Sequence, residues 1–143
     1  MLNLEKIINN TLLNQWCKNN GIDLCILFGS VVSEKTHANS DLDIAIYCEN
    51  RELIDLKLKL MGELEDIFKT TIDLVILRPD MSPLLRHEIL LKGKPLYISD
   101  QKLYIEQLIY TVKLYDDVPF LNKWQDLSLS VKFRKLKDVA SNN

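Results

Sequence analysis

Leu27-Phe28-Gly29-Ser30, followed after ten residues by Asp41-Leu42-Asp43, decides the fold of this chain. Apolar runs at residues 22–28 and 42–48 predict two strands, one leading into the Gly-Ser turn and one carrying the two acids at its start. Carboxylates two positions apart in a strand point to the same face of a sheet. Such a pair beside a turn of small residues suits Mg²⁺ and phosphate. The spacing therefore predicts a metal-dependent nucleotide site.

Length and composition favour one globular domain with a C-terminal extension. The chain has 143 residues, of which 47% are hydrophobic, and a net charge of -2. With no overall positive field, a small nucleotide or a protein partner is expected, and direct binding to nucleic acid is not. Cys17, Cys25 and Cys48 lack the spacing of a zinc site or a disulfide framework and are interpreted as reduced core thiols. No uncharged apolar run approaches the length of a membrane span, so cytoplasmic residence is expected.

The apolar periodicity predicts helices and strands in alternation. Strands are expected at residues 22–28, 42–48, 71–77 and 94–99, the last at a sheet edge because Pro95 cannot donate to a central ladder. Helices are expected at residues 4–19, where Gly21 caps the end, at 51–69, from Ser82-Pro83 to Gly93, at 100–115 and at 120–137. The expected class is α/β (α+β), with a small mixed sheet of about four strands flanked by helices.

A third acid, Asp73, interrupts an apolar strand in which an unpaired charge would be costly to bury. If the strands at 42–48 and 71–77 are neighbours, Asp73 faces Asp41 and Asp43, and three clustered carboxylates require cations. The turn supplies the complementary half of the site. Gly29 lets the backbone approach a phosphate closely, and the Ser30 hydroxyl and nearby N–H groups can donate to phosphate oxygens.

These segments, together with Ile72-Asp73-Leu74-Val75, resemble the minimal nucleotidyltransferases of the DNA polymerase β superfamily. The resemblance covers about residues 22–99. Within that superfamily, the short chain, the segment Pro83–Leu90 with Gly93, and the helical end around Tyr115-Asp116 resemble MntA-type antitoxins, which pair with HEPN-domain ribonuclease toxins.

The resemblance implies a nucleotidyltransferase domain at residues 1–99 and a partner-binding helical extension at 100–143. It implies that Asp41, Asp43 and Asp73 are catalytic and hold two Mg²⁺ ions, and that Gly29 and Ser30 bind the triphosphate. The implied reaction transfers AMP from ATP to a tyrosine of the HEPN toxin and so neutralises the toxin. Asp73 is also implied as an acceptor of the tyrosine proton.

Two other functions stay open at this point. One is a small-molecule nucleotidyltransferase of the aminoglycoside type, against which the shortness of the chain after Ser99 argues. The other is a non-catalytic antitoxin that acts by binding, against which the presence of all three acids argues.

Several residues near the expected site have no assigned role. The spacer after Ser30 lacks the basic, glycine-containing run of many relatives, and Lys35 is a candidate substitute, while a solvated loop is the other interpretation of Lys35 and His37. Arg86 and His87, beside Glu88 on a predicted helix, are explained equally by local ion pairing and by nucleotide contact. The preference for ATP over other nucleotides rests on the resemblance.

Overall fold

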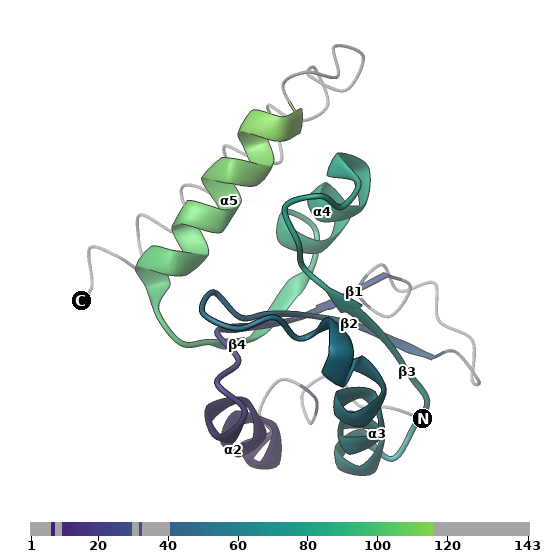
Figure 1. The fold of residues 1–143 in the computed structure, drawn as a ribbon. Coiled ribbons are helices and arrows are strands. Elements are labelled where there is room, and N and C mark those ends of the chain that lie inside the picture. Colours follow the sequence, from purple (N-terminus) through teal and green to yellow (C-terminus); the bar gives the residue numbers. More distant parts are fainter. Residues whose placement is uncertain (1–6, 8–9, 30–31, 33–40, 116–143) are drawn as a thin grey trace.

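The computed structural model describes residue 7, residues 10–29, residue 32 and residues 41–115 (Figure 1). The predicted α/β class with a four-stranded mixed sheet is confirmed. The elements, in chain order, are α2 (Thr11–Asn19), β1 (Leu24–Phe28), β2 (Leu42–Tyr47), the 3₁₀ helix η2 (Ile54–Leu56), α3 (Lys57–Phe68), β3 (Ile72–Ile76), α4 (Pro83–Leu90), β4 (Lys94–Ile98) and α5 (Gln101–Tyr115).

The sheet has the order β3-β2-β1-β4. Strand β1 pairs antiparallel with both β2 and β4, whereas β2 and β3 are parallel. Strand β4 lies at an edge, as Pro95 predicts, and its register with β1 shifts between Cys25 and Ile26. The parallel pair is the feature that matters for the site, because it brings the starts of β2 and β3 to the same end of the sheet.

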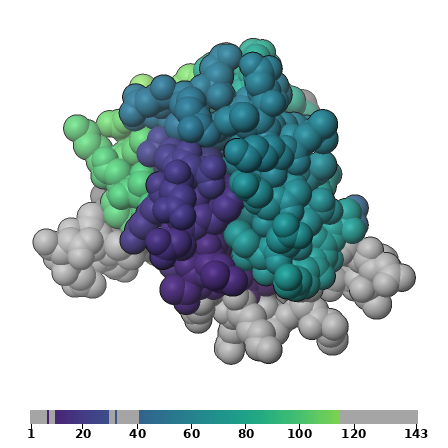
Figure 2. All heavy atoms as spheres, turned by 60° about the horizontal axis from the view of Figure 1, so that its bottom comes forward, coloured from purple at the N-terminus to yellow at the C-terminus, as the bar shows by residue number. Residues whose placement is uncertain are grey.

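Helices cover both faces of the sheet, with α2 and α3 on one side and α4 and α5 on the other (Figure 1). Figure 2 shows α2 and α3 side by side, and the Trp16 indole of α2 donates a hydrogen bond to Glu63 of α3 at 3.1 Å. Alternate strand residues point to opposite layers. In β2, for example, Ile44 packs in the α2/α3 layer and Ala45 in the α4/α5 layer, and both are fully buried.

The first predicted helix, residues 4–19, is interrupted at Asn10, which is extended (φ -83°, ψ 108°) and caps α2 by accepting from the Leu13 N–H. The apolar stripe runs on across this break, so periodicity alone could not locate it. The end is as predicted. Gly21 has φ +67°, the N–H of Gly21 donates to Lys18 O and the N–H of Ile22 donates to Cys17 O, which is the Schellman arrangement.

The helix predicted at residues 51–69 also begins later than expected. Residues 51–53 are not helical, η2 occupies Ile54–Leu56, and α3 starts at Lys57. The helix opened by Ser82 is confirmed, with the Ser82 hydroxyl accepting from the Leu85 N–H and Pro83 at the first position. The helix predicted at residues 120–137 lies outside the described residues. Within the described part of the chain, no helix is long and apolar enough to cross a membrane.

Candidate functional site

Asp43 and Asp73 are direct neighbours across the parallel pair of strands. Each is the second residue of its strand, and the two are partners in the β2–β3 register, where adjacent strands lie about 4.8 Å apart. Asp43 lies two positions before Ala45, so its side chain is on the α4/α5 face of the sheet. Asp41 immediately precedes β2. The structure therefore brings the three predicted acids to one end of the sheet.

The expectation that Asp73 sits in a buried position is wrong. Asp73 is exposed, as is Asp41, and Asp43 is partly buried. Strand β3 lies at the edge of the sheet. In this strand Ile72 and Leu74 are buried, whereas Asp73 between them points to the other face and is open to solvent. Exposure makes the acids accessible to a substrate from solution.

Gly29 lies directly against the Asp43 side chain. Strand β1 ends at Phe28, which pairs with Asp43, and Gly29 follows with φ +82°. A Cβ placed on Gly29 would overlap Asp43 Oδ2 and would lie 3.0 Å from Asp43 Cγ. Only glycine satisfies both the backbone angle and the close approach to this carboxylate at position 29.

The electrostatics of the cluster are those of carboxylates that repel one another. Partial burial raises the pKa of Asp43, and the neighbouring carboxylates of Asp73 and Asp41 raise it further. The Asp73 side chain also interacts with Asp43 by hydrogen bonding, which favours the protonated form. The ionised cluster is therefore destabilised in the absence of a cation.

Carboxylate oxygens are the type of ligand that Mg²⁺ binds in company with substrate phosphates, so the chemistry of the three acids suits this ion. In residues 7, 10–29, 32 and 41–115, no group of three or more His, Cys, Asp or Glu side chains is arranged to hold a metal ion. The metal-binding role of Asp41, Asp43 and Asp73 stays a prediction. Ser30, Lys35 and His37 lie outside the described residues, so their predicted or open roles stay as they were.

Arg86 is a buried link between α4 and α5, and its other interpretation, nucleotide contact, stays a hypothesis. Its side chain is 2% exposed and reaches from α4 to α5, where its Nε donates to Thr111 Oγ1 at 3.1 Å and its guanidinium contacts Gln107 Oε1 and stacks on Tyr110. Nη1 donates to Arg78 O at 3.4 Å. Local ion pairing with Glu88 is wrong, because Glu88 pairs with Lys92. His87 is also buried.

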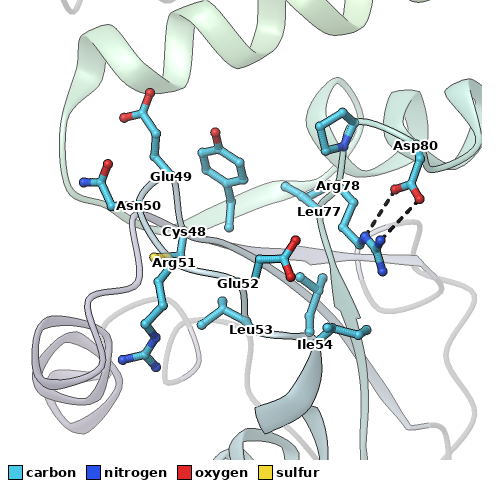
Figure 3. Close-up of a pocket in the computed structure, with 13 residues that line it drawn as sticks. Cys48, Glu49, Asn50, Arg51, Glu52, Leu53, Ile54, Leu77, Arg78 and Asp80 are labelled. Atoms are coloured by element: carbon cyan, nitrogen blue, oxygen red, sulfur yellow. Dashed lines mark hydrogen bonds and ion pairs between the residues drawn. The ribbon is translucent and has the colours of Figure 1, made fainter.

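A hollow of about 520 Å³ lies at the opposite end of the parallel strands, and sequence reasoning missed it (Figure 3). We call it the β2–β3 hollow; it is lined by residues 47–54 and 76–80. Its rim carries charged side chains and its wall is apolar. The available signal was the run of charged and polar residues at 49–52 after a buried strand, of which residues 51 and 52 fall in the predicted helix.

Comparison with known proteins agrees with this geometry. The family model described as polymerase beta, nucleotidyltransferase, matches residues 10–102. No curated protein matches the sequence.

Among solved structures, one described as a toxin-antitoxin with AMP-PNP is 25% identical, with a TM-score of 0.65 over 87% of this chain and 98% of that one. A second, described as the MntA-HepT toxin-antitoxin, is 22% identical, with a TM-score of 0.61 over 89% of this chain and 98% of the other. A third, described as a tri-AMPylated HEPN toxin of Shewanella oneidensis in complex with MNT antitoxin, is 21% identical, with a TM-score of 0.62 over 90% of this chain and 99% of the other.

The matched region runs from the N-cap of α2 to the start of α5 and includes the sheet, Gly29 and the three acids. It is well over half of the sequence. The chain belongs to the polymerase β nucleotidyltransferase family.

Proposed function

We propose that this protein is an antitoxin that transfers AMP from ATP to a tyrosine of a HEPN-domain ribonuclease toxin and thereby silences it. The observation that carries the proposal is the cluster of Gly29, Asp43 and Asp73, with Asp41 beside it, in a nucleotidyltransferase fold. A toxin-antitoxin structure containing AMP-PNP, similar over nearly the whole of both chains, supports the nucleotide and the partner.

The residues of the cluster divide the work between charge and shape. Asp41, Asp43 and Asp73 would hold Mg²⁺, which when bound neutralises phosphate charge and activates a hydroxyl. Gly29 lets the backbone of the turn approach the triphosphate and, by its lack of a Cβ, leaves Asp43 in place. Ser30 is proposed to donate its hydroxyl to a phosphate oxygen.

The proposed reaction is a single in-line displacement. The tyrosine oxygen forms a bond to the α-phosphorus of ATP, the bond between that phosphorus and the bridging oxygen breaks, and pyrophosphate leaves with that oxygen. The hydroxyl proton passes to Asp73, which the open edge of the sheet exposes to an incoming side chain. The product is an AMP-tyrosine, whose bulk and negative charge repel RNA from the toxin.

The test is to mix the protein with its HEPN-domain partner toxin, ATP and Mg²⁺, and to weigh the toxin by mass spectrometry. We expect an increment of one or more AMP units, which the Asp41→Ala/Asp43→Ala double variant does not produce. Inhibition of the toxin by that variant, with no increment from the wild type, would establish an antitoxin that acts by binding alone.

A further inference from the structure

We infer that the β2–β3 hollow is the docking site for a basic segment of the partner toxin, separate from the carboxylates that carry out the transfer. The inference rests on the proposed function, because it takes the partner to be an RNA-cleaving protein. It concerns the end of the sheet that the nucleotide chemistry does not use.

The walls of the hollow are fixed by hydrogen bonds to residues from two loops and two helices. The Asp23 carboxylate, before β1, accepts from the Glu49 N–H at 2.8 Å and from the Ser99 hydroxyl, after β4, at 3.2 Å. The Tyr47 hydroxyl accepts from Gln107 of α5 at 3.4 Å. Arg86 of α4 holds the carbonyl of Arg78. A hollow tied to the sheet and to two helices is preformed, which lowers the entropic cost of filling it.

The charges around the hollow favour a cationic occupant. Arg78 is paired with Asp80 at 3.2 Å, and Figure 3 shows Arg51 directed away from Glu52. Within the described residues, neither Glu49 nor Glu52 forms an ion pair. After the Arg78–Asp80 pair, the charged lining consists of the Glu49 and Glu52 carboxylates and the Arg51 guanidinium, so the hollow carries an excess of one negative charge.

The remaining lining is apolar and suits a protein side chain. Leu53 and Leu77 are buried, whereas Ile54 is 41% exposed at the edge of the hollow. An apolar centre with a charged rim is the usual anatomy of a protein interface. The matching segment would carry Lys or Arg beside an apolar residue.

An RNA-cleaving toxin supplies such a segment, because binding RNA phosphates requires Lys and Arg on its surface. Acidic carboxylates on the antitoxin and basic side chains on the toxin are complementary, and this steers association. Tyr47 ends β2 four residues after Asp43, about 13 Å along the strand, so a toxin docked here leaves the three acids open for its tyrosine.

The test compares two charge reversals in the full-length protein, Glu52→Lys in the hollow and Asp66→Lys as the matched control. Asp66 is exposed on α3, the helix that packs on the sheet face opposite to Asp43. Binding to the HEPN toxin is measured by calorimetry at two salt concentrations, and AMP transfer is measured by mass spectrometry at saturating toxin. We expect Glu52→Lys to weaken binding about tenfold, more so at low salt, while Asp66→Lys leaves it unchanged. At saturating toxin, AMP transfer by Glu52→Lys should match the wild type.

The outcomes separate this inference from the proposed function. Wild-type affinity for Glu52→Lys would overturn the docking site and leave the transfer reaction standing. If the wild type binds the toxin, and Glu52→Lys binds it about tenfold more weakly, but neither protein adds AMP to the toxin, the transfer reaction is overturned and the docking site stands. A change in the oligomeric state of the isolated Glu52→Lys protein, with toxin affinity unchanged, would assign the hollow to a second copy of the chain and overturn the inference.

Discussion

Gly29 is in van der Waals contact range of the Asp43 carboxylate, so the glycine and the acid form one structural unit. Gly29 follows β1 and Asp43 pairs with the last residue of that strand, which places the turn beside the acid. Two independent constraints, a φ of +82° and the absence of room for a Cβ, require glycine at this position. Gly29 and Asp43 are therefore linked by contact as well as by sequence spacing.

Gly29→Ala is expected to lower AMP transfer by about a hundredfold, because its methyl group displaces the Asp43 carboxylate. The strained backbone should also cost about 1–3 kcal/mol of unfolding free energy. Gly62→Ala is the control, since a Cβ there meets nothing within 4 Å, and in a helix it should stabilise by about 0.5–1 kcal/mol. Urea unfolding and toxin mass increments measure the two effects. Wild-type transfer by Gly29→Ala would show that Asp43 does not need this turn.

Asp43→Asn is expected to raise the temperature of unfolding in a chelator while lowering AMP transfer by about a hundredfold or more. The amide keeps the shape of the side chain and removes the repulsion from Asp73 and Asp41, whereas transfer loses a charged group. The pKa of Asp43 is raised above 3.8 in the folded protein, so the unfolded chain ionises first and the folded state loses stability as the pH rises past 3.8. Below pH 3.8 the carboxyl is protonated in both states, and this loss of stability is absent. The stabilisation of Asp43→Asn should therefore be present at neutral pH and absent in acid. Equal unfolding temperatures at neutral pH would contradict the repulsion.

Arg86→Ala is expected to lower the unfolding free energy by about 2–4 kcal/mol, because it removes the hydrogen bonds that the guanidinium donates to Thr111 Oγ1 and Gln107 Oε1 and opens a cavity between α4 and α5. Arg51→Ala removes an exposed arginine with no such contacts and should change stability by less than about 0.5 kcal/mol. Arg86→Lys keeps the charge without the planar group that stacks on Tyr110, and should fall between the two. Urea denaturation ranks the three variants.

Much of the architecture could be predicted from the sequence, because it depends on local patterns. Apolar runs located the four strands, and Pro95 identified an edge. The residues predicted to form the site lie together where they are described, because their spacing reflects strands that begin at the same end of the sheet. Their chemical roles stay predictions.

What the sequence could not provide depends on contacts between distant residues. Arg86 looks like an exposed helical cation until α5 is packed against it, 21 to 25 residues away in the chain. The β2–β3 hollow combines two loops and rests on Asp23 and Gln107, which no local pattern connects. The break at Asn10 is hidden because the apolar stripe continues through it.

Tyr104→Phe is expected to remove a loss of stability at alkaline pH. Burial in the α4/α5 layer raises the pKa of Tyr104 from 10.0 to about 12, so the folded state favours the protonated phenol. The unfolded chain ionises first as the pH passes 10, and stability falls until about pH 12; at pH 11 the loss is about 1.4 kcal/mol. Phenylalanine keeps the ring and cannot ionise. Urea unfolding at pH 8 and pH 11 should therefore show that the unfolding free energy falls by about 1.4 kcal/mol less in Tyr104→Phe than in the wild type. An identical decline in both proteins would mean that Tyr104 ionises as freely in the folded state as in the unfolded one.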